Sequence, residues 1–133
     1  MGLYTERSWR ELQTCDQLLI VLFVAVAREV DCTILEGRRS KERQLELYRR
    51  GKSKVTFGLH NETPSRAVDV APSPIDWNDT PRFEAFAAVV LRKADELDIP
   101  IRWGGNWARD WDRVGPRPKQ RFDDLVHFEL VDG

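Results

Sequence analysis

The chain has 133 residues, of which 41% are hydrophobic and 32% are charged, and its formal net charge at pH 7 is −1. This length is typical of one domain with its own hydrophobic core, so we treat residues 1–133 as a single domain. A near-neutral chain lacks the basic excess of a nucleic-acid-binding protein, and we predict no nucleic-acid partner. Lys and Arg do gather within residues 37–54. That cluster fits either a solvated helix face or a surface that meets an acidic polymer.

The first expected element is a long helical stretch. Ser8 and Glu11 form a capping-box pattern that predicts its start, with an interruption near residues 14–16 and an end near residue 30. The apolar run 18–27 is about half as long as a membrane-spanning helix. The acidic residues ahead of it do not fit the positive leader of a signal peptide. We therefore expect a buried core helix, no stable membrane insertion and no export signal.

A strand, a helix and a second strand are expected next. Residues 32–37 predict a short strand, and residues 40–51 predict an amphipathic helix with Leu45 and Tyr48 facing inward. Residues 66–72 then alternate as a strand that places Asp69 on the same face as Ala67.

The last third of the chain predicts one more helix and two strands. Thr80 is expected to cap a helix that begins at Pro81 and continues to residue 97. Four small or branched residues of this helix suit packing against a sheet: Ala85, Ala88, Val89 and Ala94. Strands are expected at residues 99–105 and 127–131. Helices and strands alternate without a regular βαβ repeat, so we predict an α+β fold with a small antiparallel sheet flanked by helices.

The two cysteines do not form a metal-binding pattern. Cys15 and Cys32 both lie in apolar surroundings and neither belongs to a CxxC motif. Buried free thiols are expected, and a bridge between the two remains an alternative.

His60, Asp69 and His127 are the candidate metal ligands. A catalytic zinc ion needs three protein ligands and an open position, and two imidazoles with one carboxylate suit that ion. His60 and Asp69 flank one turn and strand, whereas His127 comes from a distant strand. Two histidines and one of many aspartates also coincide by chance, so solvated or core histidines are the alternative interpretation.

Asp124 lies three residues before His127. A zinc hydrolase needs a carboxylate that accepts a proton from the attacking water and passes it to the leaving amine. A residue at this spacing can reach over the metal without binding it. The alternative is that Asp123 and Asp124 form a solvated turn.

Several motifs in one order carry a family resemblance. "GLHNETPSRAVD" is similar to the pattern S-x-H-x-x-G-x-A-x-D with two extra residues, and "EGRRSKERQLELYRRGKS" is similar to an EGxR segment followed by QxxLYxxGxS. "RWGGNW" and "FDDLVHFEL" complete the set. Together they resemble the zinc D-Ala-D-Ala carboxypeptidases and L-alanyl-D-glutamate endopeptidases, and within them the phage endolysin branch. The resemblance runs from about Ser8 to Leu130. Gly58 and Ser65 depart from it, because the family has serine and glycine there.

The resemblance implies roles for individual residues. His60, Asp69 and His127 would bind Zn²⁺, and Asp124 would be the general base and acid. Arg39 would support the substrate carbonyl or the developing oxyanion.

Three further residues are candidates for substrate contacts. Arg38 is the rival of Arg39, and Thr56 is the candidate for the hydrogen bond that the family serine would make. Trp107 is a candidate wall of a binding groove, because sugars stack on aromatic faces. Trp111 shares that interpretation, whereas Trp103 fits the core equally well.

The resemblance also implies a fold and an activity. The fold would be that of the hedgehog and D,D-peptidase zinc enzymes. The activity would be hydrolysis of the L-alanyl-D-glutamate bond in bacterial peptidoglycan stem peptides, by a monomer made in the phage-infected bacterial cytoplasm that acts on the cell wall. One alternative is a D-alanyl-D-alanine carboxypeptidase or dipeptidase. Another is a non-catalytic zinc-bearing binding module, against which the presence of Asp124 argues.

Overall fold

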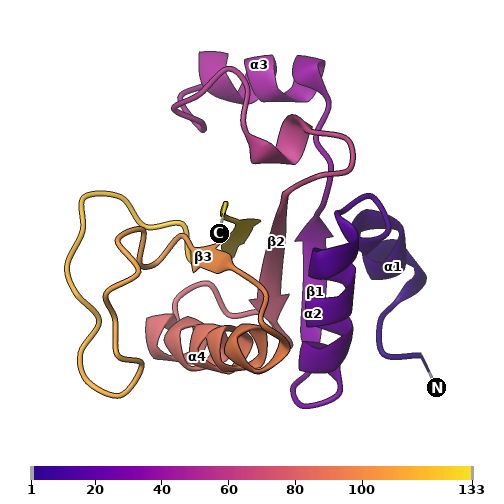
Figure 1. The fold of residues 1–133 in the computed structure, drawn as a ribbon. Coiled ribbons are helices and arrows are strands. Elements are labelled where there is room, and N and C mark those ends of the chain that lie inside the picture. Colours follow the sequence, from indigo (N-terminus) through magenta and orange to yellow (C-terminus); the bar gives the residue numbers. More distant parts are fainter. Residues whose placement is uncertain (1, 133) are drawn as a thin grey trace.

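The computed structural model describes residues 2–132 and has a mixed α+β architecture (Figure 1). The prediction of the fold class is therefore confirmed. The elements in chain order are α1 (Glu6–Leu12), α2 (Gln17–Ala27), β1 (Cys32–Glu36), α3 (Lys41–Arg49), the 3₁₀ helix η1 (Leu59–Asn61), β2 (Ala67–Pro72), α4 (Thr80–Leu97), β3 (Ile101–Trp103) and β4 (His127–Leu130).

The strands form one antiparallel sheet in the order β1-β2-β4-β3. Its register places Asp69 of β2 directly opposite His127 of β4. Glu129, two residues further along β4, lies between Ala67 of β2 and Arg102 of β3. Two predicted metal ligands are therefore cross-strand neighbours, close enough for their side chains to meet.

Alternation along the strands separates a core face from a polar face. Phe128 of β4 is fully buried and packs edge-on against Phe23 of α2 and Phe86 of α4, with ring centroids 5.5 and 6.1 Å apart. Successive residues of a strand point to opposite faces, so His127 and Glu129 point away from the helices that cover this core. Packing of α2 and α4 on one face thus leaves the other face free for the polar side chains.

The beginning of α1 differs from the prediction. Thr5 is the N-cap, and its side chain accepts a hydrogen bond from the backbone of Ser8. The Ser8 hydroxyl instead accepts from the Ile34 amide, and the Glu11 carboxylate accepts from the Gly37 amide. The capping-box interpretation was wrong because both side chains are used to attach α1 to β1. The predicted interruption is confirmed, since Asp16 caps a separate α2 that ends at Ala27.

The beginning of α4 is shifted by one residue. Asp79 is the N-cap and Thr80 is the first helical residue, so the expected Thr80 cap was wrong. The predicted inner face is partly right, because Ala94 is buried, whereas Ala85 is exposed. The larger side chains take most of that face: Phe83, Phe86, Ala87 and Val90 are buried as well.

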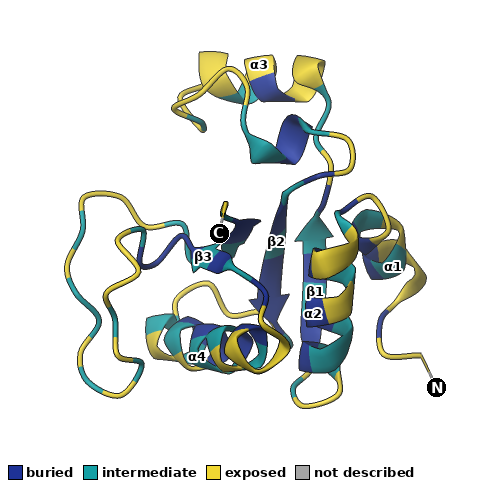
Figure 2. Ribbon diagram, viewed as in Figure 1, coloured by how far each residue is buried: buried dark blue, intermediate teal, exposed yellow. Residues whose placement is uncertain are grey.

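The orientation of α3 was also predicted wrongly. Leu45 and Tyr48 are 37% and 47% exposed, and the buried residue of α3 is Gln44. In Figures 1 and 2 this helix stands beyond the end of the sheet, away from the apolar core, and much of its surface is exposed. Its packing is polar. The Gln44 side chain donates to the Ser53 hydroxyl and the Val55 carbonyl and accepts from Arg39.

The apolar run within residues 18–27 is confirmed as a core helix. Leu19, Leu22, Phe23 and Val26 of α2 are fully buried. Within residues 2–132, no helix has the length and apolar character needed to cross a membrane.

Both cysteines are free and buried, as expected. Burial raises the pKa of the Cys15 thiol to about 12 and that of the Cys32 thiol to about 11. These thiols stay protonated at neutral pH and behave as small apolar core residues.

Candidate metal centre

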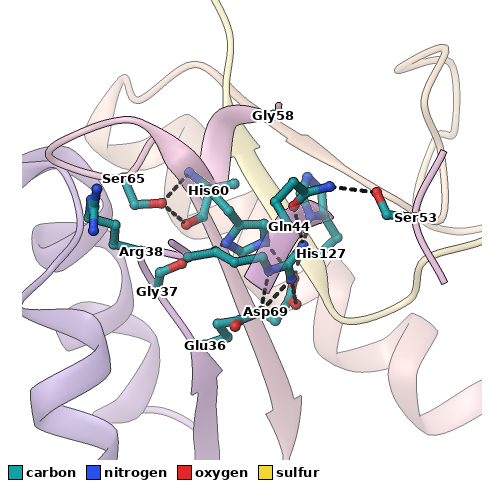
Figure 3. Close-up of polar contacts among 12 residues, drawn as sticks. Glu36, Gly37, Arg38, Gln44, Ser53, Gly58, His60, Ser65, Asp69 and His127 are labelled. Carbon is teal, nitrogen blue, oxygen red and sulfur yellow. Dashed lines mark hydrogen bonds and ion pairs between the residues drawn. The ribbon is translucent and has the colours of Figure 1, made fainter. Parts of the chain in front are cut away.

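The three predicted metal ligands meet at one point. One potential ligand atom from each of His60, Asp69 and His127 lies within 4.8 Å of the others. His60 Nε2 is 3.1 Å and His127 Nδ1 is 3.4 Å from Asp69 Oδ1. Figure 3 shows the two imidazole rings converging on the aspartate. Three donors around a common centre satisfy the protein part of a catalytic zinc site.

His60 is placed by a turn that is fastened to the segment after β1. The 3₁₀ turn begins after Gly58, whose amide donates to the Asn61 side chain. Asn61 in turn donates to the Arg39 carbonyl, and the Arg39 amide donates to the His60 carbonyl at 2.7 Å. This reciprocal pairing holds the turn over the end of β2. Residues 62–66, between this turn and β2, form the loop that connects His60 to the strand of Asp69.

The second nitrogen of each histidine ring also has a partner. His60 Nδ1 is 2.7 Å from the Gly37 carbonyl oxygen, and His127 Nε2 is 2.7 Å from Glu129 Oε1. Outer acceptors of this kind fix the orientation of metal-binding imidazoles. The two rings therefore offer different atoms to the centre, Nε2 from His60 and Nδ1 from His127.

Electrostatics link these groups in the metal-free protein. Burial opposes ionisation of Asp69, but hydrogen bonds from His127 and His60 outweigh it and hold the pKa of this carboxyl well below its usual range. Burial disfavours the charged form of His127 as well, yet the hydrogen bonds to Asp69 and Glu129 raise the pKa of His127 to about 9. A proton on His127 thus balances the carboxylates of Asp69 and Glu129. A divalent cation can supply that positive charge in its place.

Asp124 lies beside the centre without belonging to the trio. Its Oδ2 is 4.0 Å from His127 Nδ1, the ring nitrogen that faces the centre. Burial and the nearby Asp69 raise the pKa of the Asp124 carboxyl above its usual range. A raised pKa makes a carboxylate a better proton acceptor, which suits general base catalysis.

The backbone brings Asp124 to this position. Its amide donates to the Gly104 carbonyl at 2.9 Å, and its carbonyl accepts from the His127 amide at 3.1 Å. A Cβ at position 104 would lie 2.2 Å from the Asp124 carbonyl oxygen, so only glycine permits this approach.

The neighbouring Asp123 is engaged elsewhere. Its carboxylate accepts from Arg117 at 2.9 Å and from Gln120 at 2.8 Å. Hydrogen bonding to these groups outweighs burial and lowers the pKa of Asp123. Of the two adjacent aspartates, Asp124 is therefore the one with a carboxylate near the histidines.

The two candidate arginines point in different directions. Arg39 binds the Glu36 carboxylate and Gln44, and its Nη2 lies 3.7 Å from Asp69 Oδ2. Arg38 is exposed and donates to the Thr63 hydroxyl. Figure 3 shows Arg38 directed away from Asp69. Arg39, rather than its neighbour, borders the site.

Trp107 also borders the site. Its ring centroid is 5.5 Å from that of His127, and its ring also stacks with that of Phe122, with the centroids 6.4 Å apart. Trp103 is buried, as the core interpretation has it, and Trp111 packs against it. Thr56 is exposed in the loop after α3, and no hydrogen bond within residues 2–132 joins its side chain to the trio.

The roles of two groups of this site were not predicted from the sequence. The Gly37 carbonyl is a backbone acceptor, for which no residue type is a signal. Arg102 donates to Glu129 at 2.6 Å, and only the register of β3 against β4 reveals that pairing. Glu129 lies on the same side of β4 as His127, because side chains two residues apart on a strand share a face, and its carboxylate contacts the His127 ring.

Comparison of the chain with known proteins identifies its family. A family model described as phage L-alanyl-D-glutamate peptidase matches residues 3–131. Among the solved structures that match is the Serratia marcescens L-Ala D-Glu endopeptidase ChiX, with 28% sequence identity and a TM-score of 0.75 over 96% of this chain and 89% of that one. The search of curated proteins gave no match. The match over nearly the whole chain and the shared fold lead to one conclusion: the chain belongs to the phage L-alanyl-D-glutamate peptidase family, a family of cell-wall peptidases.

Proposed function

We propose that this protein is a zinc-dependent endopeptidase that hydrolyses the L-alanyl-D-glutamate bond of bacterial peptidoglycan stem peptides. The observation that carries the proposal is the convergence of His60, Asp69 and His127 with Asp124 alongside, in a chain of this family. The non-catalytic alternative leaves the carboxylate of Asp124 without a purpose. A pure binding module does not need a proton acceptor with a raised pKa beside the metal ligands.

Zinc fits the residues present. His60 Nε2, His127 Nδ1 and one carboxylate oxygen of Asp69 would hold it, a donor set typical of catalytic zinc. When bound, the ion supplies Lewis acidity, which polarises a carbonyl group and makes water a stronger acid. The acceptors at Gly37 and Glu129 would keep both rings oriented toward it.

The chain's own groups perform the proton transfers in the proposed reaction. Asp124 takes a proton from the attacking water as its oxygen bonds to the L-alanyl carbonyl carbon. It then delivers that proton to the nitrogen of D-glutamate as the peptide bond breaks. One carboxylate thus acts first as base and then as acid, and it is regenerated at the end.

Arg39 is proposed to stabilise the negative charge of the reaction. The guanidinium remains charged at all working pH values and can bind a carboxylate or an oxyanion through two hydrogen bonds. Its contacts with Glu36 and Gln44 preorganise it next to Asp69. The substrate would then bind a guanidinium whose position is already fixed by Glu36 and Gln44.

The substrate groove is proposed to run past Trp107. Its position beside His127 gives the substrate an aromatic wall, while Thr56 and Arg38 are proposed as more distant polar contacts. All of the proposed metal ligands and Asp124 come from one chain, so we propose that the enzyme works on the cell wall as a monomer.

The proposed activity is tested by mass spectrometry of purified muropeptides after incubation with the protein. We expect release of intact stem peptides, leaving L-alanine on the muramyl side, and we expect a chelator to stop the release until zinc is restored. A chelator-treated sample that is given back Mg²⁺ instead is the control. Release of free D-alanine alone from pentapeptide substrates would show a carboxypeptidase instead.

Arg39→Ala is expected to slow stem-peptide cleavage greatly while zinc content is retained. The reason is that the guanidinium borders the site but is not a metal ligand. Arg38→Ala is the comparison variant: it removes the same charge from the adjacent, outward-facing residue, and as a more distant substrate contact it is expected to slow cleavage much less. Cleavage rates and zinc content of both variants are measured side by side. Equal rates in the two variants would remove Arg39 from the mechanism.

A further inference from the structure

Glu129 is a buried carboxylate with both oxygens occupied. Its residue is 7% exposed. Oε1 lies 2.7 Å from His127 Nε2, and Oε2 accepts from Arg102 Nε at 3.1 Å and from Arg102 Nη2 at 2.6 Å. Leaving a buried carboxylate without partners is costly, so these two contacts account for its presence on the sheet.

The contact with Glu129 determines which atom His127 can offer to a metal. A neutral imidazole carries one N–H and one lone pair, and metal binding uses the lone pair. An ionised carboxylate only accepts hydrogen bonds, so Glu129 requires the N–H to be at Nε2. The lone pair is then at Nδ1, the atom 3.4 Å from Asp69 Oδ1.

Arg102 holds Glu129 in this role from the neighbouring strand. The two residues are direct cross-strand partners, because β3 pairs with β4 in a register that sets Arg102 opposite Glu129. The guanidinium also lies 5.7 Å from the ring of Trp107, which itself packs beside His127. Its fork binds one carboxylate oxygen and leaves the other directed at the imidazole.

We propose that Arg102 and Glu129 form a positioning pair that holds His127 with Nδ1 toward the metal and thereby sets zinc affinity. This inference rests on the metal site of the proposed function and adds two residues that do not touch the metal. Glu129 acts on His127, and Arg102 acts on Glu129. Partners of this kind are worth about 10- to 100-fold in metal affinity in other proteins.

Zinc affinity, measured by competition with a chelating indicator, tests the pair. Glu129→Gln is expected to weaken zinc binding about 10- to 100-fold. The amide oxygen of the new side chain will turn toward Arg102, so that its NH₂ group faces His127 and favours the wrong tautomer. Arg102→Met is expected to weaken binding less, because the carboxylate still accepts from Nε2.

The double variant Arg102→Met with Glu129→Gln gives the sharpest result. Without the guanidinium, the amide oxygen is free to accept from His127 Nε2, so the double variant is expected to bind zinc more tightly than Glu129→Gln alone. Loss of general stability would instead add the two defects together. The tautomers in the zinc-loaded wild type are read by ¹⁵N NMR of the imidazoles, since the chain has 2 histidines. We expect His60 to carry its proton on Nδ1 and His127 to carry its proton on Nε2.

Arg113→Met is the matched control for Arg102→Met. The Arg113 side chain is 34% exposed and binds Asp95 at 2.7 Å, against 37% and 2.6 Å for Arg102 with Glu129. It is expected to leave zinc affinity unchanged. Circular dichroism shows whether each variant is folded. If Glu129→Gln does not fold, Arg102→Met still tests the pair.

Three results would overturn the inference. They are unchanged zinc affinity in folded Glu129→Gln, equal losses in Arg102→Met and Arg113→Met, and a zinc-loaded spectrum with the His127 proton on Nδ1. In each of these cases the wild type still binds zinc and cleaves muropeptides, so the proposed function stands. A wild type that does not bind zinc contradicts the proposed function itself.

Discussion

His60→Ala and His127→Ala are each expected to abolish tight zinc binding and all hydrolysis. The wild type should carry about one zinc per chain, because three protein ligands and an open position make a complete catalytic site. Either substitution leaves two ligands. In the alanine variants the half-buried Asp69 also loses one of the two imidazoles that contact it. Metal analysis after gel filtration and the rate of stem-peptide release measure the two losses.

Asp76→Asn is the control for these variants, because Asp76 is an exposed aspartate outside the trio. It should retain both zinc and activity. Zinc should also raise the melting temperature of the wild type and of this control, but not of the histidine variants, because a ligand stabilises only a folded protein that binds it. Full zinc content in a folded His60→Ala or His127→Ala variant would remove the basis of the proposed mechanism.

The metal trio could be predicted because its members lie on regular elements. Asp69 lies within β2 and His127 opens the last strand, so side-chain alternation along each strand predicts which face each of them occupies. The sequence leaves open whether these strands are neighbours. The register that sets Asp69 against His127 is a property of the folded sheet.

Two of the errors in the fold, at α1 and α3, share a physical cause: the side chains bind a tertiary partner in place of the local one. Ser8 and Glu11 bind the backbone around β1 rather than the beginning of their own helix. Gln44 is buried in α3 where an apolar pattern favours Leu45, because α3 packs on a polar loop instead of the core. Hydrophobic periodicity predicts well which face of a helix packs on an apolar core, but it predicts poorly a face that is buried by hydrogen bonds.

The groups that orient the metal ligands are the ones that are hardest to predict from the sequence. The acceptor for His60 is the carbonyl of Gly37, and a backbone group leaves no mark on residue type. The partner of Glu129 comes from β3, the edge strand beside β4, and pairing across strands depends on the topology of the sheet. Ligands can thus be read from motifs, whereas the groups that orient them need the structure.

Asp124→Asn is expected to preserve zinc binding and to lower the rate of stem-peptide release by about 10² to 10⁴, the usual contribution of general acid-base catalysis. The amide has nearly the same size but cannot take up a proton from water. The carboxylate lies 4.0 Å from His127 Nδ1 and outside the trio, so the ligands should still assemble. The expected signature is a large fall in turnover at unchanged zinc content.

Asp123→Asn is the matched control, since it makes the same change one residue earlier, where the carboxylate binds Arg117 and Gln120. Its effect on turnover should be small by comparison. A reversed order, with Asp123→Asn inactive and Asp124→Asn active, would transfer the proton-shuttling role to Asp123. Joint loss of zinc and activity in Asp124→Asn would make Asp124 a ligand and reopen the assignment of Asp69. The separation of metal content from turnover is therefore what distinguishes a proton carrier from a metal ligand at this position.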